Sequence, residues 1–135
     1  MKRKEPKHKY NYALLLDDNE LDNYINQKTL EANRFANKIY VNTSSISALE
    51  FLKNLHLVNS KYFPQIIFVD INMPIIDGFQ FIENLKKEFL AKFDSIKIII
   101  LTSSIFQSEK ERALSLSKNI AFLHKPLTQE SLNQL

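Results

Sequence analysis

The chain has 135 residues, of which 44% are hydrophobic and 24% are charged, with no cysteine and a net charge of +3. This composition is typical of one folded domain with a buried core, and no apolar run approaches the roughly 18 residues that cross a membrane. The lack of cysteine excludes a disulfide framework, a thiolate nucleophile and a cysteine zinc site. We therefore expect a single domain that is not membrane-bound and is located in the cytoplasm.

The net positive charge comes from the amino-terminal end. Residues 1–9 hold five basic side chains and one acidic side chain, so the rest of the chain carries a net charge of −1. A short basic end on a nearly neutral domain is typical of a disordered, solvated segment. We therefore expect residues 1–10 to be a basic disordered tail, residues 11–135 to form the folded domain, and nucleic acid not to be a partner.

The first quarter of the chain predicts a strand and a helix. Residues 12–16 form a short apolar run that ends at Asp17 and Asp18, as expected of a buried strand that enters an acidic loop. Apolar residues then recur at helical spacing and predict a helix over residues 20–33. The apolar stripe of this helix consists of Leu21, Tyr24, Ile25 and Ala32.

The middle of the chain continues this alternation. A brief strand is predicted at residues 38–41, and the polar residues 42–45 offer N-caps for a second helix, which ends in a loop at residues 57–64. A third strand is then predicted at residues 65–70, in which residues 66–69 are apolar without a break until Asp70. Such a run is typical of a parallel strand that helices cover on both faces, and here it ends in a carboxylate.

Gly78, the only glycine in the chain, follows this strand closely. Because glycine adopts a positive φ without steric cost, we expect it to let the loop turn into a third helix. A strand at residues 97–101 then leads to a polar turn that begins at Thr102. Ser108 with Glu111 is a capping-box pattern, which predicts a fourth helix that ends near residue 118.

The carboxyl-terminal end predicts a fifth strand and a last helix. Residues 120–123 form the strand, Lys125 follows it, and Thr128 caps a helix that is cut short at residue 135. Five alternations of strand and helix favour an α/β fold, in which a parallel sheet has helices on both faces. Ligands bind such sheets beyond the carboxyl ends of the strands, so polar residues at those ends are the candidates for function.

Five polar residues should meet at this edge of the sheet: Asp17, Asp18, Asp70, Thr102 and Lys125. Three carboxylates repel one another, and a divalent cation such as Mg²⁺ relieves that repulsion. An ammonium and a hydroxyl opposite the carboxylates complete a pocket for a phosphoryl group in transfer. We therefore expect Asp70 to be the nucleophile that becomes an aspartyl phosphate.

The same arrangement predicts the metal ligands. We expect Asp18 and Asp70 to bind Mg²⁺ and Asp17 to assist directly or through water, while the backbone carbonyl of Asn72 supplies a further oxygen. Alone, the pair Asp17-Asp18 would more often be an ordinary turn or helix start, and Asp70 could be a strand-end residue. Their joint placement at one edge is what favours a site.

Four motifs carry a family resemblance: Leu-Leu-Leu-Asp17-Asp18-Asn-Glu, Asp70-Ile-Asn-Met-Pro74 with Asp77-Gly78, Ile-Ile-Ile-Leu-Thr102-Ser-Ser, and Lys125-Pro126. From about residue 11 to its end, the chain resembles the receiver domain of two-component response regulators, of the stand-alone chemotaxis-regulator type. The resemblance implies a flavodoxin-like, doubly wound fold, with a five-stranded parallel sheet of order 2-1-3-4-5 and helices on both faces. It also implies Mg²⁺-dependent phosphoryl transfer to Asp70 from a phosphohistidine of a sensor histidine kinase or a histidine phosphotransfer protein.

The resemblance further implies a switch. In the family the hydroxyl, here Thr102, turns toward the phosphate, and the aromatic residue three positions before the lysine, here Phe122, turns inward. Output would then come from docking to an unidentified downstream protein, as a monomer or a phosphorylation-linked dimer. The last helix is shorter than the family pattern, so either the chain is truncated or the face between the fourth and fifth helices is incomplete.

Two other functions remain open. A metal-dependent phosphohydrolase would also form an aspartyl phosphate, but the general acid of such enzymes is replaced here by Asn72 and no cap domain fits in the length. A docking domain that works without phosphorylation would have a degenerate site, whereas this chain has the full set of acids, hydroxyl and lysine. We expect a signalling phosphoacceptor rather than an enzyme, able to catalyse its own phosphorylation and dephosphorylation.

Overall fold

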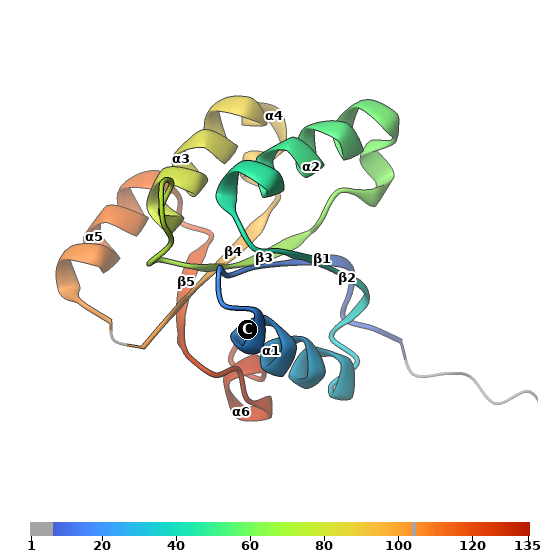
Figure 1. Ribbon diagram of the computed structural model, residues 1–135, viewed down its shortest axis with the longest axis vertical. Helices are drawn as coiled ribbons and strands as arrows, with labels where there is room; N and C mark the ends of the chain where they lie inside the picture. The colour runs from blue at the N-terminus through green and yellow to red at the C-terminus, as the bar shows by residue number, and fades with distance from the viewer. Residues whose placement is uncertain (1–6, 104) are drawn as a thin grey trace, which may run out of the picture.

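The computed structural model describes residues 7–103 and 105–135, which form a parallel sheet between two layers of helices (Figure 1). The order of the strands is β2-β1-β3-β4-β5, as predicted, and it reverses beside β1. No helix in these two ranges is long and apolar enough to cross a membrane. The five strands are β1 (Tyr10–Leu16), β2 (Ala36–Asn42), β3 (Ile66–Asp70), β4 (Lys97–Thr102) and β5 (Ile120–His124).

The helices cover both faces of the sheet. They are α1 (Glu20–Ala32), α2 (Ser45–Val58), α3 (Gly78–Glu88), α4 (Leu90–Phe93), α5 (Gln107–Leu116) and α6 (Gln129–Leu132), with a 3₁₀ turn at Ser60–Tyr62. α1 and α6 pack on one face, and α2 to α5 on the other (Figure 1). The short helix α4 was not predicted, whereas the short last helix was.

Alternate residues of each strand supply two separate cores. In β1, for example, Leu14 and Leu16 pack under α2 and α3, while Ala13 and Leu15 face α1 and α6. Because both faces are covered, every residue of β3 is buried, as its unbroken apolar run predicts. Burial of each leucine or isoleucine in these cores stabilises the fold by about 1.5–3 kcal/mol.

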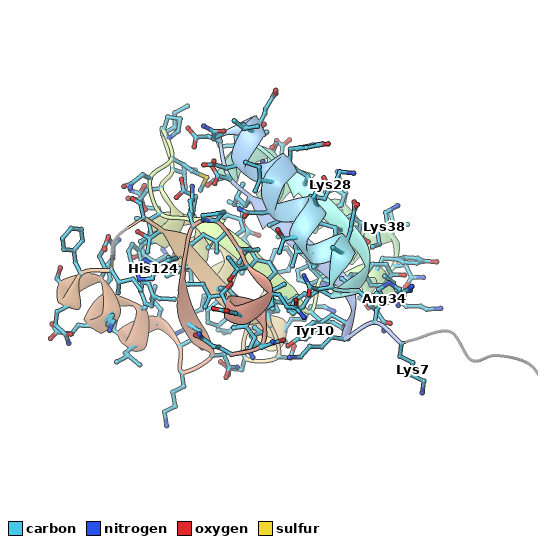
Figure 2. The ribbon with its side chains drawn as sticks, turned by 90° about the horizontal axis from the view of Figure 1, so that it is seen from below. Lys7, Tyr10, Lys28, Arg34, Lys38 and His124 are labelled. Atoms are coloured by element: carbon cyan, nitrogen blue, oxygen red, sulfur yellow. The ribbon has the colours of Figure 1, made fainter. Side chains whose placement is uncertain are left out.

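The amino-terminal segment joins the sheet earlier than predicted. Residues 1–6 of the predicted tail, like residue 104, lie outside the described residues. Tyr10 is already paired with Ala36 in β2, and Lys9 donates a hydrogen bond of 2.6 Å from Nζ to the backbone carbonyl of Leu135. Figure 2 shows the basic side chains of Lys28, Arg34 and Lys38 on the side where this segment emerges, with His124 across the molecule.

The inward face of α1 is mostly polar, which the sequence pattern did not predict. Its buried residues are Asn23, Asn26 and Leu30. The predicted apolar stripe is exposed to solvent instead: Leu21, Tyr24, Ile25 and Ala32. The helix itself is confirmed, but the face it buries was wrongly predicted.

Hydrogen bonds to loop backbone explain this inversion of α1. The side-chain amide of Asn23 donates to the carbonyl of Asp17 at 2.8 Å, and the Asn26 side-chain oxygen accepts from the backbone N–H of Leu127 at 2.9 Å. Both bonds satisfy buried backbone groups at the carboxyl edge of the sheet, which would otherwise cost free energy. The inner face of α1 therefore anchors two loops of this edge.

The start of α5 differs from the predicted capping box. Ser108 and Glu111 lie inside the helix, which begins at Gln107, and the Glu109 carboxylate accepts a bond of 3.4 Å from the backbone N–H of Phe106. The prediction of the helix is confirmed, and its capping residues are wrong. The residue three positions before Glu109 is Phe106, which has no side-chain acceptor, so the Ser-x-x-Glu pattern did not mark the start of the helix.

Candidate functional site

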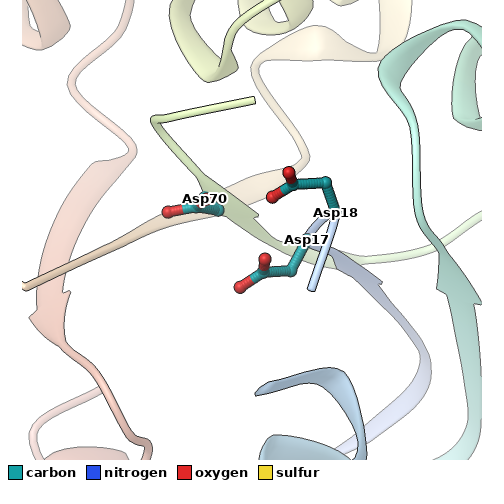
Figure 3. A group of neighbouring side chains, drawn as sticks. All are labelled: Asp17, Asp18 and Asp70. Carbon is teal, nitrogen blue, oxygen red and sulfur yellow. The ribbon is translucent and has the colours of Figure 1, made fainter. Parts of the chain in front are cut away.

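Three carboxylates lie together beyond the carboxyl ends of β1 and β3 (Figure 3). Asp17 and Asp18 follow β1 directly, and Asp70 is the last residue of β3. One oxygen of each lies within 4.8 Å of the others. Asp17 and Asp70 are only 2% and 6% exposed, whereas Asp18 is exposed. Two of the three negative charges are therefore held largely out of water.

Lys125, the residue after β5, supplies the opposite charge. Its Nζ atom lies 2.6 Å from Asp17 Oδ2, 3.2 Å from Asp70 Oδ1 and 3.2 Å from Asp22 Oδ2. An ammonium has three N–H donors, so each carboxylate can take one. The lysine therefore joins the end of β1, the end of β3 and the first turn of α1.

The charges of the site shift the pKa of two groups in a way that burial alone does not explain. Burial raises the pKa of Asp70, and the charge of Asp17 raises it further, while Lys125 opposes the rise. Burial by itself lowers the pKa of Lys125, but the hydrogen bond and charge of Asp17, followed by those of Asp70, raise it overall. Lys125 therefore stays charged at neutral pH, and a cation added beside Asp70 would oppose the rise in the pKa of Asp70.

Thr102 and the loop after β5 complete this edge. Thr102 ends β4, is 4% exposed, and lies one position beyond Leu101, the register partner of Asp70. Its backbone carbonyl accepts a bond of 2.9 Å from the backbone N–H of Lys125. The end of β4 is thus held beside Lys125.

The two remaining predicted residues lie further out. Phe122 is half-buried in β5, paired in register with Ile100, and packs against the core under α2, α3 and α5. Asn72 is exposed in the loop two residues after Asp70. The structure therefore brings the acids and the lysine together, places Thr102 at the end of the strand beside Asp70, and places Phe122 on the edge strand β5.

Close backbone packing at Gly78 positions the loop after Asp70. The Gly78 N–H donates to the carbonyl of Ile71 at 2.9 Å, and a Cβ at Gly78 would lie 2.4 Å from the Asp70 carbonyl oxygen. Gly78 does not have a positive φ, while Ile75 in the same loop has φ 68°. The predicted reason for the glycine is therefore wrong: the site needs a residue without a side chain, and the left-handed turn occurs three residues earlier.

Asp22 and Asn23 are parts of this edge that the sequence analysis missed. Asp22 contacts Lys125, and Asn23 holds the backbone of Asp17. A signal was present, because Asp22 lies four residues after Asp18 and so can face the same side as the acidic loop. Acids are also common in the first turn of any helix, which made that signal weak.

Comparisons with known proteins agree with this geometry. The family model of the response regulator receiver domain matches residues 13–135. The sensor histidine kinase CheAY of Helicobacter pylori is 29% identical over 120 residues, which are 89% of this chain and 14% of that protein. The response regulator Rre1 of Synechocystis is 28% identical over 74 residues, 55% of this chain and 31% of that protein. The chain thus spans a minor part of these relatives.

Solved structures show the same fold. A two-component response regulator from Cytophaga hutchinsonii is 28% identical, with a TM-score of 0.84 over 94% of both chains. The receiver domain of the histidine kinase CKI1 from Arabidopsis thaliana, complexed with Mg²⁺, has a TM-score of 0.76 over 96% of this chain and 94% of that one; at 20% identity it shows the fold alone. The family match over almost the whole described chain shows that this protein belongs to the response regulator receiver domains of two-component systems.

Proposed function

We propose that Asp70 accepts a phosphoryl group from a phosphohistidine and that the added charge switches a protein-docking face. The observation that carries this proposal is the position of Lys125 Nζ, 3.2 Å from Asp70 Oδ1 and within reach of two further carboxylates. A lysine in that position can neutralise charge on a phosphoryl group attached to Asp70. The acids alone would bind a cation but would not favour a bound phosphate.

The three carboxylates also fit a magnesium ion. Oxygen ligands that lie within 4.8 Å of one another, with one exposed acid at the rim, are the donor set that Mg²⁺ prefers. Asp17, Asp18, Asp70 and the backbone carbonyl of Asn72 would hold it. When bound, Mg²⁺ would offset the charge of the acids and of the arriving phosphoryl group. The Mg²⁺ bound by the receiver domain of CKI1 supports this assignment.

The proposed transfer is a displacement at phosphorus. A carboxylate oxygen of Asp70 forms a bond to phosphorus while the bond between phosphorus and the imidazole nitrogen breaks, and that nitrogen keeps the electron pair. Lys125 balances the charge on the phosphoryl oxygens. The Thr102 hydroxyl then donates a hydrogen bond to one of them, and Phe122 turns inward beside α5.

The phosphoryl donor would be a sensor histidine kinase or a histidine phosphotransfer protein. Sensor histidine kinases are among the relatives that this chain matches, which supports a kinase as its partner. The downstream protein is unidentified. A monomer or phosphorylation-linked dimer, and a location in the cytoplasm, stay predictions. Membership of the receiver family favours this function over a phosphohydrolase or a phosphorylation-independent docking domain.

Intact mass spectrometry after incubation with acetyl phosphate and Mg²⁺ tests the proposal. The wild type should gain one phosphoryl group, and Asp70→Asn should gain none. Asp77→Asn is the matched control, because Asp77 caps α3 through a bond of 2.8 Å from the Gln80 N–H and asparagine is an equally good cap.

Three results would contradict parts of this proposal. An unmodified wild type, or an equal adduct on Asp70→Asn, would exclude Asp70 as the acceptor. An adduct that forms equally well with excess EDTA would exclude the role of Mg²⁺. Rapid multiple turnover of a free phosphoester would favour the phosphohydrolase instead.

A further inference from the structure

Asp22 gives Lys125 a carboxylate that the proposed phosphoryl chemistry does not require. Its Oδ2 atom lies 3.2 Å from Lys125 Nζ, as close as Asp70 Oδ1. The Asp22 side chain is 38% exposed, whereas that of Asp17 is 2% exposed. Within the described part of the chain, the ion pairs of Lys125 are with these three aspartates and not with Glu20, the other acid in the first turn of α1.

The Asp17 carboxylate accepts two hydrogen bonds and is also a candidate metal ligand. Its Oδ1 atom accepts a bond of 3.0 Å from the backbone N–H of Asn19, and its Oδ2 atom takes the 2.6 Å bond from Lys125. The same carboxylate belongs to the group of three acids that fits Mg²⁺. An ammonium and a metal ion are both cations, so binding of the metal to Asp17 must weaken the ion pair between Lys125 and Asp17.

We propose that Asp22 is a positioning residue that retains the Lys125 ammonium when Asp17 turns toward Mg²⁺, so that the lysine stays beside Asp70. This inference rests on the proposed function, since it concerns the same acids and the same metal. Asp22 and Lys125 line one cavity of about 210 Å³, together with Ile25, Asn26 and Pro126, so this ion pair is not packed tightly against the rest of α1.

The backbone around Asp22 suits this role because it is held firmly. The side chain of Asn19 caps α1 by accepting a bond of 3.0 Å from the Asp22 N–H. Asn23 and Asn26 tie the same helix to Asp17 and to Leu127, on the two loops that carry the other partners. Asp22 is therefore presented from a fixed turn, while its half-exposed carboxylate keeps the freedom to follow the lysine.

The dissociation constant of Mg²⁺, measured by calorimetry without any phosphodonor, tests the proposal. Asp22→Asn should raise this constant about three- to fivefold, the range expected for loss of one partly exposed charge pair. Asp22→Glu should restore most of the affinity, because it keeps the carboxylate. Glu20→Gln is the matched control, since it removes a charge from the same helical turn without touching Lys125, and should leave the constant within about twofold.

A double-mutant cycle with Lys125→Met distinguishes an effect of Asp22 that acts through Lys125 from a direct effect of the Asp22 charge on the metal. If Asp22 acts through the lysine, Asp22→Asn should not weaken Mg²⁺ binding further in the Lys125→Met background. Equal weakening in both backgrounds, or no effect of Asp22→Asn in the wild type, would overturn the proposal. A wild type that fails to bind Mg²⁺ would overturn it as well.

Nuclear magnetic resonance of the Lys125 ammonium gives a readout that does not depend on the folding of Lys125→Met. In the Mg²⁺-bound wild type, exchange of the ammonium protons with water should be slower than in Mg²⁺-bound Asp22→Asn. Equal exchange would count against the proposal. A wild type that binds Mg²⁺ with the expected effect of Asp22→Asn, yet gains no phosphoryl group, would refute the proposed function and leave the role of Asp22 intact.

Discussion

Lys125 lies closer to Asp17 than to Asp70: its Nζ atom is 2.6 Å from Asp17 Oδ2 and 3.2 Å from Asp70 Oδ1. Lys125 and Asp17 are 108 residues apart, yet they meet because β1 and β5 run parallel and end at the same edge. The almost fully buried Asp17 depends on this lysine for its counter-charge. The lysine is therefore part of the stability of the domain as well as of the proposed chemistry.

Replacement of Lys125 by glutamine should destabilise the protein in the absence of metal. The change leaves two buried carboxylates without their ammonium, and we expect a loss of about 2–4 kcal/mol in the free energy of unfolding, measured with urea. Mg²⁺ should restore more stability to Lys125→Gln than to the wild type. Lys53→Gln is the control, because the ion pair with Glu88 is exposed and should cost below about 1 kcal/mol. Equal losses of stability in Lys125→Gln and Lys53→Gln would show that Lys125 has no special role in balancing the buried carboxylates.

Asp70→Asn should stabilise the metal-free protein at neutral pH. Burial raises the pKa of Asp70, so the folded state binds its proton more tightly than the unfolded state does. The stability linked to that proton is complete below the unfolded pKa and is lost as the pH rises through the folded pKa. At pH 7 the ionised group therefore costs stability, which the neutral amide avoids.

Unfolding with urea from pH 4 to pH 8 checks the direction of this effect of Asp70→Asn on stability. The gain from Asp70→Asn should be largest at the upper end of the range and should shrink as the pH falls. Asp94→Asn, at an exposed acid outside the site, should leave stability unchanged throughout. A gain that grows on acidification would contradict the assigned direction of the pKa shift.

Gly78→Ala should cost about 2–3 kcal/mol of stability. The new Cβ would lie 2.4 Å from the Asp70 carbonyl oxygen and 2.9 Å from the Ile71 Cα, and backbone atoms cannot give way easily. Urea unfolding measures the loss, and the yield of phosphoryl adduct should fall with it because Asp70 must move. Lys87→Ala, exposed in the same helix, should change stability by less than about 0.5 kcal/mol.

Ile75→Gly should stabilise the loop that follows Asp70. Ile75 has φ 68° and is 87% exposed, so it carries the strain of a β-branched residue in the left-handed region without much packing in return. Glycine relieves that strain but loses more conformational entropy on folding. The difference predicts a gain of about 0.5–1 kcal/mol in the free energy of unfolding. Ile75→Val keeps the branching and should show no gain. A loss with glycine would mean that the isoleucine side chain contributes packing after all.

Thr102→Ala should still accept the phosphoryl group but lose the conformational response. The hydroxyl lies at the buried end of β4, beside the strand that carries Asp70, and it is the donor we assign to the phosphate. Amide spectra before and after phosphorylation should therefore differ around α5 and β5 in the wild type and in the control Ser103→Ala, and far less in Thr102→Ala. The same spectral change in all three proteins would exclude Thr102 as the switch.

Much of the fold and part of the site could be predicted from the sequence because they depend on local patterns. The unbroken apolar run of β3 requires cover on both faces, which helices on either side of a parallel sheet provide. Parallel strands end at one edge, so Asp17, Asp70, Thr102 and Lys125 had to gather there once the alternation of strands and helices was recognised. The strand order, in contrast, was inferred from the family resemblance.

The tertiary structure alone decided how α1 turns about its axis, and with it the position of Asp22. Helical periodicity places Leu21, Tyr24 and Ile25 on the buried face. The backbone groups of the loop just before α1 and of the distant loop after β5 needed partners, however, and Asn23 and Asn26 supply them. The need for Gly78 likewise arises from the carbonyl of Asp70, eight residues away, and not from its own φ. Both depend on contacts between segments that a local pattern does not record, because such patterns describe one element at a time.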